Sequence, residues 1–406
     1  MFRFHRNKAV HLLMAAMLVI ILGRLISFIL VGFSMRCATE LHISNPNIVV
    51  RKEDLWEALN SLNGSLFQGD HVPAYNCSTS SISFSNTHME NGRQHKFTGT
   101  QLFSHPQEVD LLEKICQFQQ GQSILQGSYR RRNFTILINH PNICNMQRNE
   151  KLHLIVLIKS KPSHTMRRML IRRYWANTNC WAGRNIRRAF LLGTTVNQTA
   201  MIAIEAEARK YEDILQQDFV DRYRNLTLKV FFGLQWAIAF CPETKWLLML
   251  DDDIFVHTRN VLPVLDLLNS LATSKLLIGN FNGERTVLRN RSKWMISRSE
   301  YAHVKYPIYS SGAWVVIGRD LALELYIASR FTRMIPFDDA YIGLLLNKLL
   351  YIPVSISGIY LHNPRVLKRR ELEDILAIHG VTTVARQKRL WILTRQVELC
   401  TSKPGS

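Results

Sequence analysis

The sequence lacks the spacings that define several common classes of protein. None of its seven cysteines forms a Cys-x-x-Cys pair, which argues against a zinc site. A Gly-x-x-x-x-Gly-Lys-Ser/Thr loop and a Gly-x-Gly-x-x-Gly turn are both absent, which argues against P-loop nucleotidases and dinucleotide-dependent dehydrogenases. Acidic residues are scarce, with 31 Asp and Glu against 51 Lys and Arg. Because no zinc-finger spacing, RNA-binding aromatic signature or basic zipper accompanies that excess, we expect no nucleic-acid partner, and an anionic membrane or substrate remains open.

The N-terminal region contains one long apolar run, residues 9–33, preceded by three basic residues. As a helix it would be about 37 Å long, enough to cross a bilayer. Arg24 costs about 2.5–3.5 kcal/mol there, which the Leu, Ile, Val and Phe residues offset at about 0.3–0.6 kcal/mol each. The sequence therefore predicts a cytoplasmic tail (1–8), a signal-anchor and a luminal body. A cleaved signal peptide is the alternative, but it would need a shorter apolar core.

Glycosylation sequons and cysteines agree with a luminal body. The six Asn-x-Ser/Thr sequons are typical of an exported protein, and they are Asn63, Asn76, Asn133, Asn197, Asn225 and Asn290. All seven cysteines follow the apolar run, and scattered disulfides are expected in that compartment. Seven is an odd number, so at least one thiol is free or pairs with another chain. Cys37, beside the membrane, is the candidate for a disulfide-linked dimer.

The polarity and the hydrophobic pattern of the chain change near Lys151. Residues 34–149 are irregular and polar, which is typical of a stem, whereas residues 150–406 alternate apolar strands with helices and are predicted to form the catalytic domain. This alternation predicts an α/β fold with a mainly parallel sheet covered on both faces. The expected strands are 153–160, 188–194, 246–256, 275–281, 313–318 and 351–360. The expected helices are 202–217, 226–240, 262–271, 320–331 and 338–350, and the basic stretch from Arg365 is also expected to be helical.

Three adjacent carboxylates, Asp251, Asp252 and Asp253, interrupt an apolar run. In open α/β sheets ligands bind at the carboxyl ends of strands, and three partly buried carboxylates need a compensating cation. Their oxygens suit Mg²⁺ or Mn²⁺. Because side chains alternate along a strand, Asp251 and Asp253 point to the same side. His362, after the last strand, can complete the metal site, although a structural role is the alternative. An acidic turn in solvent is the alternative for the aspartates.

A second acidic pair, Asp338 and Asp339, opens a predicted helix. Either residue can cap that helix, or one can act as a general base for an attacking hydroxyl. A cation at the first acidic site can neutralise a diphosphate leaving group, but it can equally serve a phosphatase or a nuclease. Together the two sites supply a cation for the leaving diphosphate and a base for the attacking hydroxyl, which displacement at a nucleotide-sugar requires.

Residues from about 151 to 361 resemble the β1,3-glycosyltransferase family that contains the β1,3-galactosyl- and β1,3-N-acetylglucosaminyltransferases. Six pieces occur in the family's order: Arg168-Met-Leu-Ile-Arg-Arg-Tyr-Trp175, Phe190-Leu-Leu-Gly193, Tyr211 to Lys229, Asp251 to Asp253, Tyr306 to Gly312, and Asp338-Asp-Ala-Tyr-Ile-Gly343. The resemblance implies a GT-A fold of Rossmann type, a UDP-sugar donor, Mn²⁺, inversion to a β1,3 linkage and a type II Golgi membrane protein. UDP-galactose is the favoured donor, a glycan on protein or lipid is the acceptor, and N-acetylglucosamine or N-acetylgalactosamine transfer is the alternative.

The resemblance also suggests roles for single residues. Arg168 and Arg172 can steady the donor phosphates, or they can pair with core carboxylates. Asp218 is expected on the nucleotide side, Asp251 and Asp252 at the donor, and Gly312 where backbone approaches a sugar closely.

Two departures from the family pattern bear on catalysis. The family usually has Glu-Asp-Val where this chain has Asp338-Asp339-Ala340, so Asp339 is the expected base; Tyr174 stands where threonine is usual. A luminal metal-dependent hydrolase and a non-catalytic glycan-binding or chaperone-like relative remain as alternatives.

Overall fold

A computed structural model describes residues 86–90, 93–97, 105, 109–119, 134–147, 150–282, 285–351, 353–364 and 369–400. The predicted cytoplasmic tail, the signal-anchor and most of the stem lie outside these residues. None of the helices in the described ranges is long and apolar enough to span a bilayer. The chain divides into two compact units. The described part of the smaller unit is an antiparallel hairpin of β1 (Asn86–Glu90) and β2 (Arg93–Phe97).

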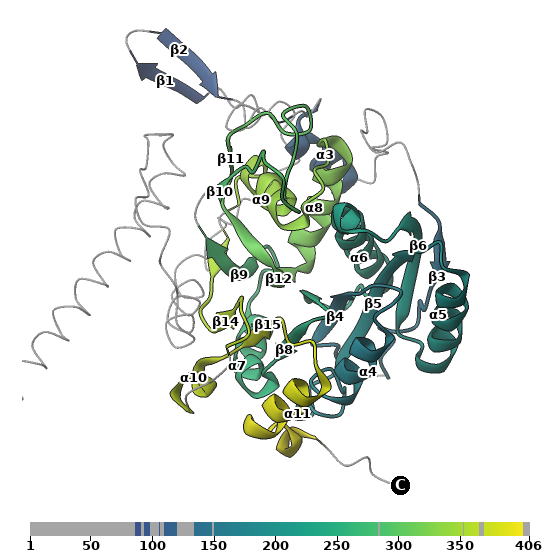
Figure 1. Cartoon of the computed structure of the whole chain (residues 1–406). Helices are drawn as coiled ribbons and strands as arrows, with labels where there is room; N and C mark the ends of the chain where they lie inside the picture. The colour runs from purple at the N-terminus through teal and green to yellow at the C-terminus, as the bar shows by residue number, and fades with distance from the viewer. Residues whose placement is uncertain are drawn as a thin grey trace, which may run out of the picture. The chain divides into compact units, whose positions relative to one another are not determined.

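The larger unit is built on an eight-stranded sheet in the order β13-β9-β12-β7-β4-β5-β6-β3 (Figure 1). Strands β7, β4, β5 and β6 run parallel, as the alternating pattern predicts, but β12 is antiparallel to both β7 and β9. The sheet is therefore mixed. Its strands are β3 (Ile136–Ile138), β4 (Leu154–Lys159), β5 (Ile186–Thr194), β6 (Ile214–Val220), β7 (Trp246–Asp251), β9 (Leu277–Asn282), β12 (Tyr309–Gly318) and β13 (Val354–Ser355).

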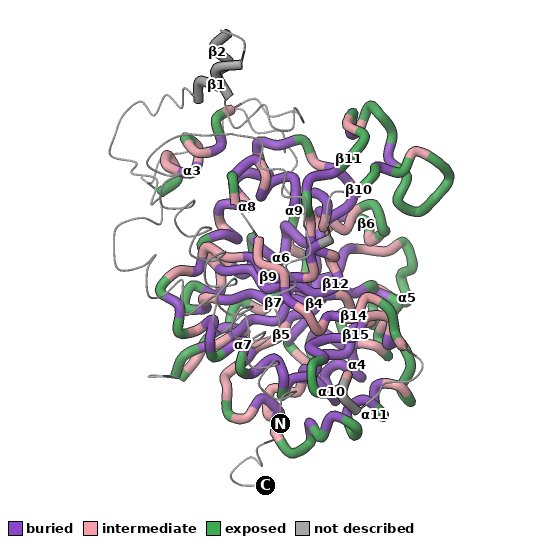
Figure 2. The backbone as a smooth tube through the Cα atoms, turned by 90° about the vertical axis from the view of Figure 1, so that its left-hand side faces the viewer, coloured by how far each residue is buried: buried purple, intermediate pink, exposed green. Residues whose placement is uncertain are grey.

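Helices cover both faces of this sheet. Every residue of β4 is buried, and its side chains alternate between two cores, with Val156 in one and Leu157 in the other. The first core is closed by α4 (Thr165–Arg173), α5 (Gln198–Tyr211), α7 (Thr258–Ser270) and α11 (Val384–Leu393). The second core is closed by α3 (Leu111–Gln119), α6 (Leu226–Phe240), α8 (Arg319–Phe331) and α9 (Asp338–Lys348). The buried sheet between them runs through the centre of Figure 2.

Four expected elements differ from the structure. The strands expected over 246–256 and 351–360 are each divided between two sheets, the first after Asp251 and the second after Ser355. The helix predicted over 202–217 ends at Tyr211, because Glu212 takes a left-handed conformation at φ 50° and the following residues form the buried strand β6. The C-terminal stretch is not wholly helical. Between α10 (Arg369–Asp374) and α11 it contributes β15 (Ala377–His379), which pairs with β8 (Ile254–Val256) and β14 (Ile359–Tyr360) in a second sheet. In these last two places tertiary pairing overrides local preference.

Disulfides join distant parts of the larger unit. Cys144 is bonded to Cys241 and Cys180 to Cys400, and Cys116 is also disulfide-bonded. The second of these bridges closes a loop of 220 residues and fastens the C-terminal segment to the region after α4. These bonds confirm the disulfides expected among the cysteines. Cys37, the candidate for a bond to another chain, lies outside the described residues.

Candidate functional site

The site lies where two parallel strands end side by side. Lys159 is the last residue of β4 and Asp251 the last of β7, and the two are paired in register. Their side chains meet, with Lys159 Nζ 2.9 Å from Asp251 Oδ1. The carboxyl end of the sheet is thus where charged groups gather, as the general rule for α/β sheets predicts.

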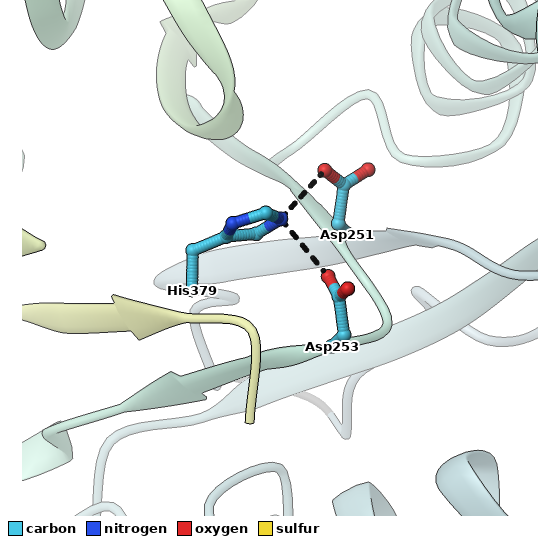
Figure 3. Close-up of side chains that lie close together, drawn as sticks. All are labelled: Asp251, Asp253 and His379. Atoms are coloured by element: carbon cyan, nitrogen blue, oxygen red, sulfur yellow. Dashed lines mark ion pairs between the residues drawn. The ribbon is translucent and has the colours of Figure 1, made fainter. Parts of the chain in front are cut away.

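Asp251, Asp253 and His379 form a cluster suited to a divalent cation (Figure 3). His379 Nε2 lies 3.2 Å from Asp253 Oδ1 and 3.9 Å from Asp251 Oδ2, and one potential ligand atom from each residue falls within 4.8 Å of the others. One ion at about 2.0–2.3 Å from each atom fits that spread. Carboxylate oxygens and an imidazole nitrogen are ligands that Mn²⁺ accepts, so the residues fit the predicted cofactor.

The protonation of this cluster is coupled to metal binding. The hydrogen bond to Asp253 raises the pKa of His379 above its ordinary value. Burial raises the pKa of Asp253, but the His379 hydrogen bond and charge outweigh it and leave that pKa lowered. The two shifts favour an imidazole proton shared with the ionised Asp253 carboxylate when no metal is bound. An incoming cation must displace it, because imidazole binds metal only when neutral.

The histidine predicted from the sequence, His362, is not the one that the structure places in the cluster. His362 is exposed and lies outside the cluster, and His379 takes the place expected for it. Strand β15 brings His379 beside β8 through the register Ile254↔His379. The signal in the sequence was the apolar run from Ile375 to Ile378 ending in histidine, which the helical interpretation of the C-terminal stretch concealed.

Asp252 points away from the cluster into a polar network. Its oxygens accept hydrogen bonds from Ser160 Oγ at 2.7 Å and Arg167 Nη1 at 2.8 Å, and lie 2.7 Å from His164 Nδ1. Burial raises its pKa, but these partners outweigh that effect and leave it lowered. Asp252 therefore anchors the start of α4 against the end of β7, and its expected donor role stays a prediction.

The second acidic pair stands beside the first site and is joined to it by Lys159. Lys159 Nζ, which is buried, donates to Asp338 Oδ2 at 2.8 Å and to the carbonyl of Gly312 at 2.9 Å. A Cβ on Gly312 would lie 3.3 Å from Asp338 Oδ2, 3.4 Å from Asp339 Cβ and 3.4 Å from Lys159 Nζ. Gly312 thus makes room for the ionic bridge, and its expected contact with a sugar stays a prediction.

Asp339 has a different environment from Asp338. It is half-buried, and within the described ranges its carboxylate accepts a hydrogen bond from the backbone N–H of Ala340 at 2.7 Å and has no cation at ion-pair distance. Burial and the neighbouring Asp338 charge raise its pKa to about 7. Neither aspartate is the N-cap of α9, since both lie in its first turn and Phe337 precedes them as the cap. A carboxylate with a raised pKa is the better proton acceptor near neutral pH.

Arg168 and Arg172 belong to the core and not to the ligand face. Arg168 Nη2 pairs with Glu207 at 2.6 Å, while Arg172 pairs with Glu207 at 2.6 Å and Asp213 at 2.7 Å. All four side chains are almost fully buried. Of the two roles left open by the sequence, pairing with core carboxylates is the one observed.

Asp218 lies at the edge of the sheet, away from the acidic cluster. Its Oδ1 accepts the backbone N–H of Thr135 at 2.9 Å, which fastens β6 to the residues before β3. A nearby aspartate, Asp221, is instead buried with Lys229, whose Nζ lies 2.8 Å from its Oδ2. The structure gives Asp218 a structural partner and places no further site residue beside it, so its nucleotide role stays a prediction.

Sequence reasoning did not single out Lys159. The signal available was an isolated lysine closing the apolar run Leu154–Ile158, which is unfavourable to bury unless carboxylates compensate it. Only the register of β4 and β7, with β12 beside them, shows that those carboxylates belong to both acidic sites.

The fold and the site together define an α/β protein in which a cluster suited to a divalent cation lies beside a second acidic pair. Residues 166–355 match the sequence model of the galactosyltransferase family. This part of the chain is therefore similar to that family, and the matched region contains both acidic sites but not His379.

Two characterised relatives show the same similarity. A mouse acetylgalactosaminyl-O-glycosyl-glycoprotein β-1,3-N-acetylglucosaminyltransferase is 36% identical over 237 residues, which cover 56% of this chain and 59% of the relative. Mouse β-1,3-galactosyltransferase 1 is 29% identical over 300 residues, covering 73% and 87%. A crystallised galactosyltransferase bound to donor and acceptor sugar analogues matches 62% of this chain and 97% of its own, at 13% identity and a TM-score of 0.32, which is too low to bear on the fold.

Proposed function

We propose that this protein is an inverting, metal-dependent β1,3-glycosyltransferase with a GT-A-like catalytic domain. It would transfer a hexose, with galactose favoured, from a UDP-sugar to a glycan acceptor on protein or lipid. The observation that carries this proposal is the bridge made by Lys159. It brings the cation cluster of Asp251, Asp253 and His379 next to Asp338 and Asp339, so that a leaving diphosphate and an attacking hydroxyl can be served at once.

The geometry supports a single displacement. The acceptor oxygen attacks the anomeric carbon of the donor sugar while its proton passes to the Asp339 carboxylate. The bond from that carbon to the diphosphate oxygen breaks, and the electron pair leaves with UDP. Mn²⁺ held by Asp251, Asp253 and His379 would supply the positive charge that stabilises this leaving group. Lys159 pairs with both Asp251 and Asp338, which leaves Asp339 as the carboxylate without a cationic partner among the described residues and free to take the proton.

The donor sugar has a second candidate. Transfer of N-acetylglucosamine is favoured by the mouse relative of that activity, which is more similar in sequence over its shorter match than the galactosyltransferase. Nothing in the acidic sites separates the two, because both sugars leave from the same diphosphate. We keep galactose as the first candidate because the matched family model is that of galactosyltransferases.

The decisive experiment measures UDP release by the purified luminal portion with UDP-galactose, UDP-N-acetylglucosamine and UDP-N-acetylgalactosamine. Each donor is tested with and without a panel of β-galactosyl and N-acetylhexosaminyl acceptors, in Mn²⁺ and then in EDTA. Acceptor-dependent release that EDTA abolishes supports a transferase. Release that needs no acceptor would favour the hydrolase. Mn²⁺-dependent glycan binding without release from any donor would favour the non-catalytic relative.

We also propose that the protein is a single-pass type II protein of the Golgi membrane. The apolar run and sequons in the sequence support this location. Of the three sequons in the described ranges, Asn197 and Asn290 are exposed, whereas Asn225 is half-buried and its Nδ2 donates to Val220 O at 2.8 Å. N-glycans removable by endoglycosidase and retention in membranes after alkaline carbonate extraction are expected, and an unglycosylated cytosolic protein would contradict the proposal.

A further inference from the structure

A long, basic loop lies near helix α9, which begins with the acidic pair Asp338 and Asp339. It joins β10 (Arg285–Thr286) to β11 (Lys305–Tyr306), which pair with each other and lie near α9 (Figure 1). The loop is held by its own bonds. Arg289 donates to the carbonyls of Ile296, Tyr301 and His303 at 2.9, 2.6 and 2.6 Å. It is also fastened from outside, because Arg224 donates to Met295 O at 2.9 Å and pairs with Glu300.

This anchoring presents an exposed aromatic pair. Trp294 is 50% exposed and Tyr223, on the short helix η1 (Tyr223–Asn225), is 36% exposed. Burial raises the pKa of the Tyr223 hydroxyl, and the nearby Trp294 side chain opposes that shift. Lys293 Nζ lies 4.5 Å from the Trp294 ring centroid and 5.7 Å from that of Tyr223. An indole held with half its surface in water is a costly arrangement for a fold, and a ligand that covers it would recover that cost.

The aromatic pair adjoins the proposed base. The Tyr223 ring lies 6.4 Å from that of Phe337, the residue directly before Asp338. Burial and the charges of Asp339 and Asp338 raise the pKa of the Tyr223 hydroxyl to about 12, which places that hydroxyl in the field of the acid pair. A sugar whose apolar C–H face lies on Trp294 and Tyr223 would therefore have its hydroxyls within the neighbourhood of Asp339.

The charge around this platform is strongly positive. Residues 285–306 contain six Lys and Arg residues and the single acidic residue Glu300, which is already paired with Arg224. Among the residues that the structure describes, Arg285, Arg291, Lys293 and Arg298 are exposed and take part in no ion pair. Like charges gathered without carboxylates repel one another, and an anionic ligand relieves that repulsion. The loop is the largely exposed stretch beside β10 and β11 in Figure 2.

We propose that Trp294 and Tyr223 form the acceptor platform of this enzyme, and that the basic loop 285–306 selects a glycan acceptor bearing a sulfate or carboxylate group. The proposal rests on the transferase function above. The acceptor sugar lies on the two rings with a hydroxyl directed to Asp339, and its anionic substituent reaches Lys293 and the exposed arginines of the loop. Aromatic stacking fixes the sugar's orientation, and the charge supplies the preference.

The test compares neutral and anionic forms of one acceptor. Galactosyl-N-acetylglucosamine oligosaccharides that are unsubstituted, 6-sulfated, or sialylated on a branch remote from the accepting sugar are each given to the enzyme with its active donor and Mn²⁺. We expect the KM for at least one anionic form to be about tenfold lower than for the neutral form, and the difference to shrink in 0.5 M salt because screening weakens surface charge. The sulfated and sialylated arms distinguish the two anions.

Variants assign the preference to the loop. Lys293→Glu combined with Arg298→Glu should abolish the preference for the anionic acceptor, and calorimetry of UDP in Mn²⁺ checks that the donor site of this variant is still formed. Trp294→Ala should raise the KM for both acceptor forms by about tenfold, a loss typical of one aromatic contact. Lys151→Glu is the matched control for charge, since Lys151 is exposed and precedes the opposite end of β4. Ile202→Ala on α5 is the control for an exposed apolar side chain.

A second readout keeps failure of this inference separate from failure of the transferase function. Quenching of tryptophan fluorescence by the sulfated oligosaccharide, measured without donor, should saturate and should be lost in Trp294→Phe. Equal KM values for neutral and anionic acceptors would overturn the inference while the transferase function stands. An effect of Lys151→Glu equal to that of the loop variant would also overturn the inference. Binding of the protein to anionic lipid vesicles through this loop, with no preference among acceptors, would overturn it as well.

Discussion

Lys159 is the residue on which the geometry of the site depends most. We expect Lys159→Met, which keeps the length of the side chain but removes its charge, to destabilise the domain. The lysine is buried, with Nζ 2.9 Å from Asp251 Oδ1 and 2.8 Å from Asp338 Oδ2. Its removal leaves two carboxylates facing each other without a cation. Removing one partner of a buried ion pair costs about 3–5 kcal/mol, which corresponds to a fall in melting temperature of roughly 10 °C for a domain of this size.

The pH and metal dependence of that loss make the prediction specific. Burial lowers the pKa of Lys159, but the charges and hydrogen bonds of Asp251 and Asp338 outweigh it and hold that pKa above its ordinary value. The contribution of Lys159 to stability is therefore fully present at pH 7 and is lost only as pH rises through the alkaline range. In the variant the unpaired carboxylates can instead take up protons. The deficit should therefore be largest at pH 8 and shrink towards pH 5. Mn²⁺ should recover part of it, because a cation beside Asp251 replaces the missing charge.

Differential scanning fluorimetry at pH 5, 6.5 and 8, with and without Mn²⁺, measures these effects directly. Lys151→Met serves as the control, since it removes an exposed lysine close to the other end of the same strand. A melting temperature within 2 °C of the wild type at pH 8, or a deficit that does not change with pH, would refute the bridging role. If the variant fails to fold, Lys159→Arg should restore folding by returning the charge, while displacing Asp338 enough to reduce turnover.

The other predictions concern the base and the metal site. Asp339→Asn should reduce transfer by about 10²–10⁴-fold, the usual share of a general base, with UDP binding in Mn²⁺ almost unchanged by calorimetry; Asp338→Asn should reduce it less, and the reverse order would make Asp338 the base. The wild-type kcat/KM should rise with pH and level off above about 7, because Asp339 accepts a proton only when ionised and its pKa is raised to about 7; a profile flat from pH 5 to 8 would exclude it. His379→Ala should raise the Mn²⁺ concentration needed for half-maximal UDP binding by at least about tenfold, whereas His362→Ala should leave it unchanged; equal effects would remove His379 from the metal site.

The sequence by itself determined the elements whose pattern is local. Strand β4 and helix α6 (Leu226–Phe240) fall where the apolar runs predict them, and the family motifs located both acidic sites. These features could be inferred because strand and helix periodicities are written in neighbouring residues. The three adjacent aspartates were recognisable for the same reason, since their cost of burial is visible without any knowledge of the fold.

Only the tertiary structure decided which side chains meet. Asp251 and Lys159 stand 92 positions apart in the numbering of the chain, and His379 reaches Asp253 through a strand whose partners lie far away in sequence. Asp252, between two predicted ligands, turns to Ser160 because successive side chains point to opposite sides. Strand β6 and strand β15 form where their neighbours supply hydrogen bonds, which no local propensity reports. Contacts between distant segments depend on register and on the packing of whole elements, and for this reason the choice of His379 over His362 belonged to the fold.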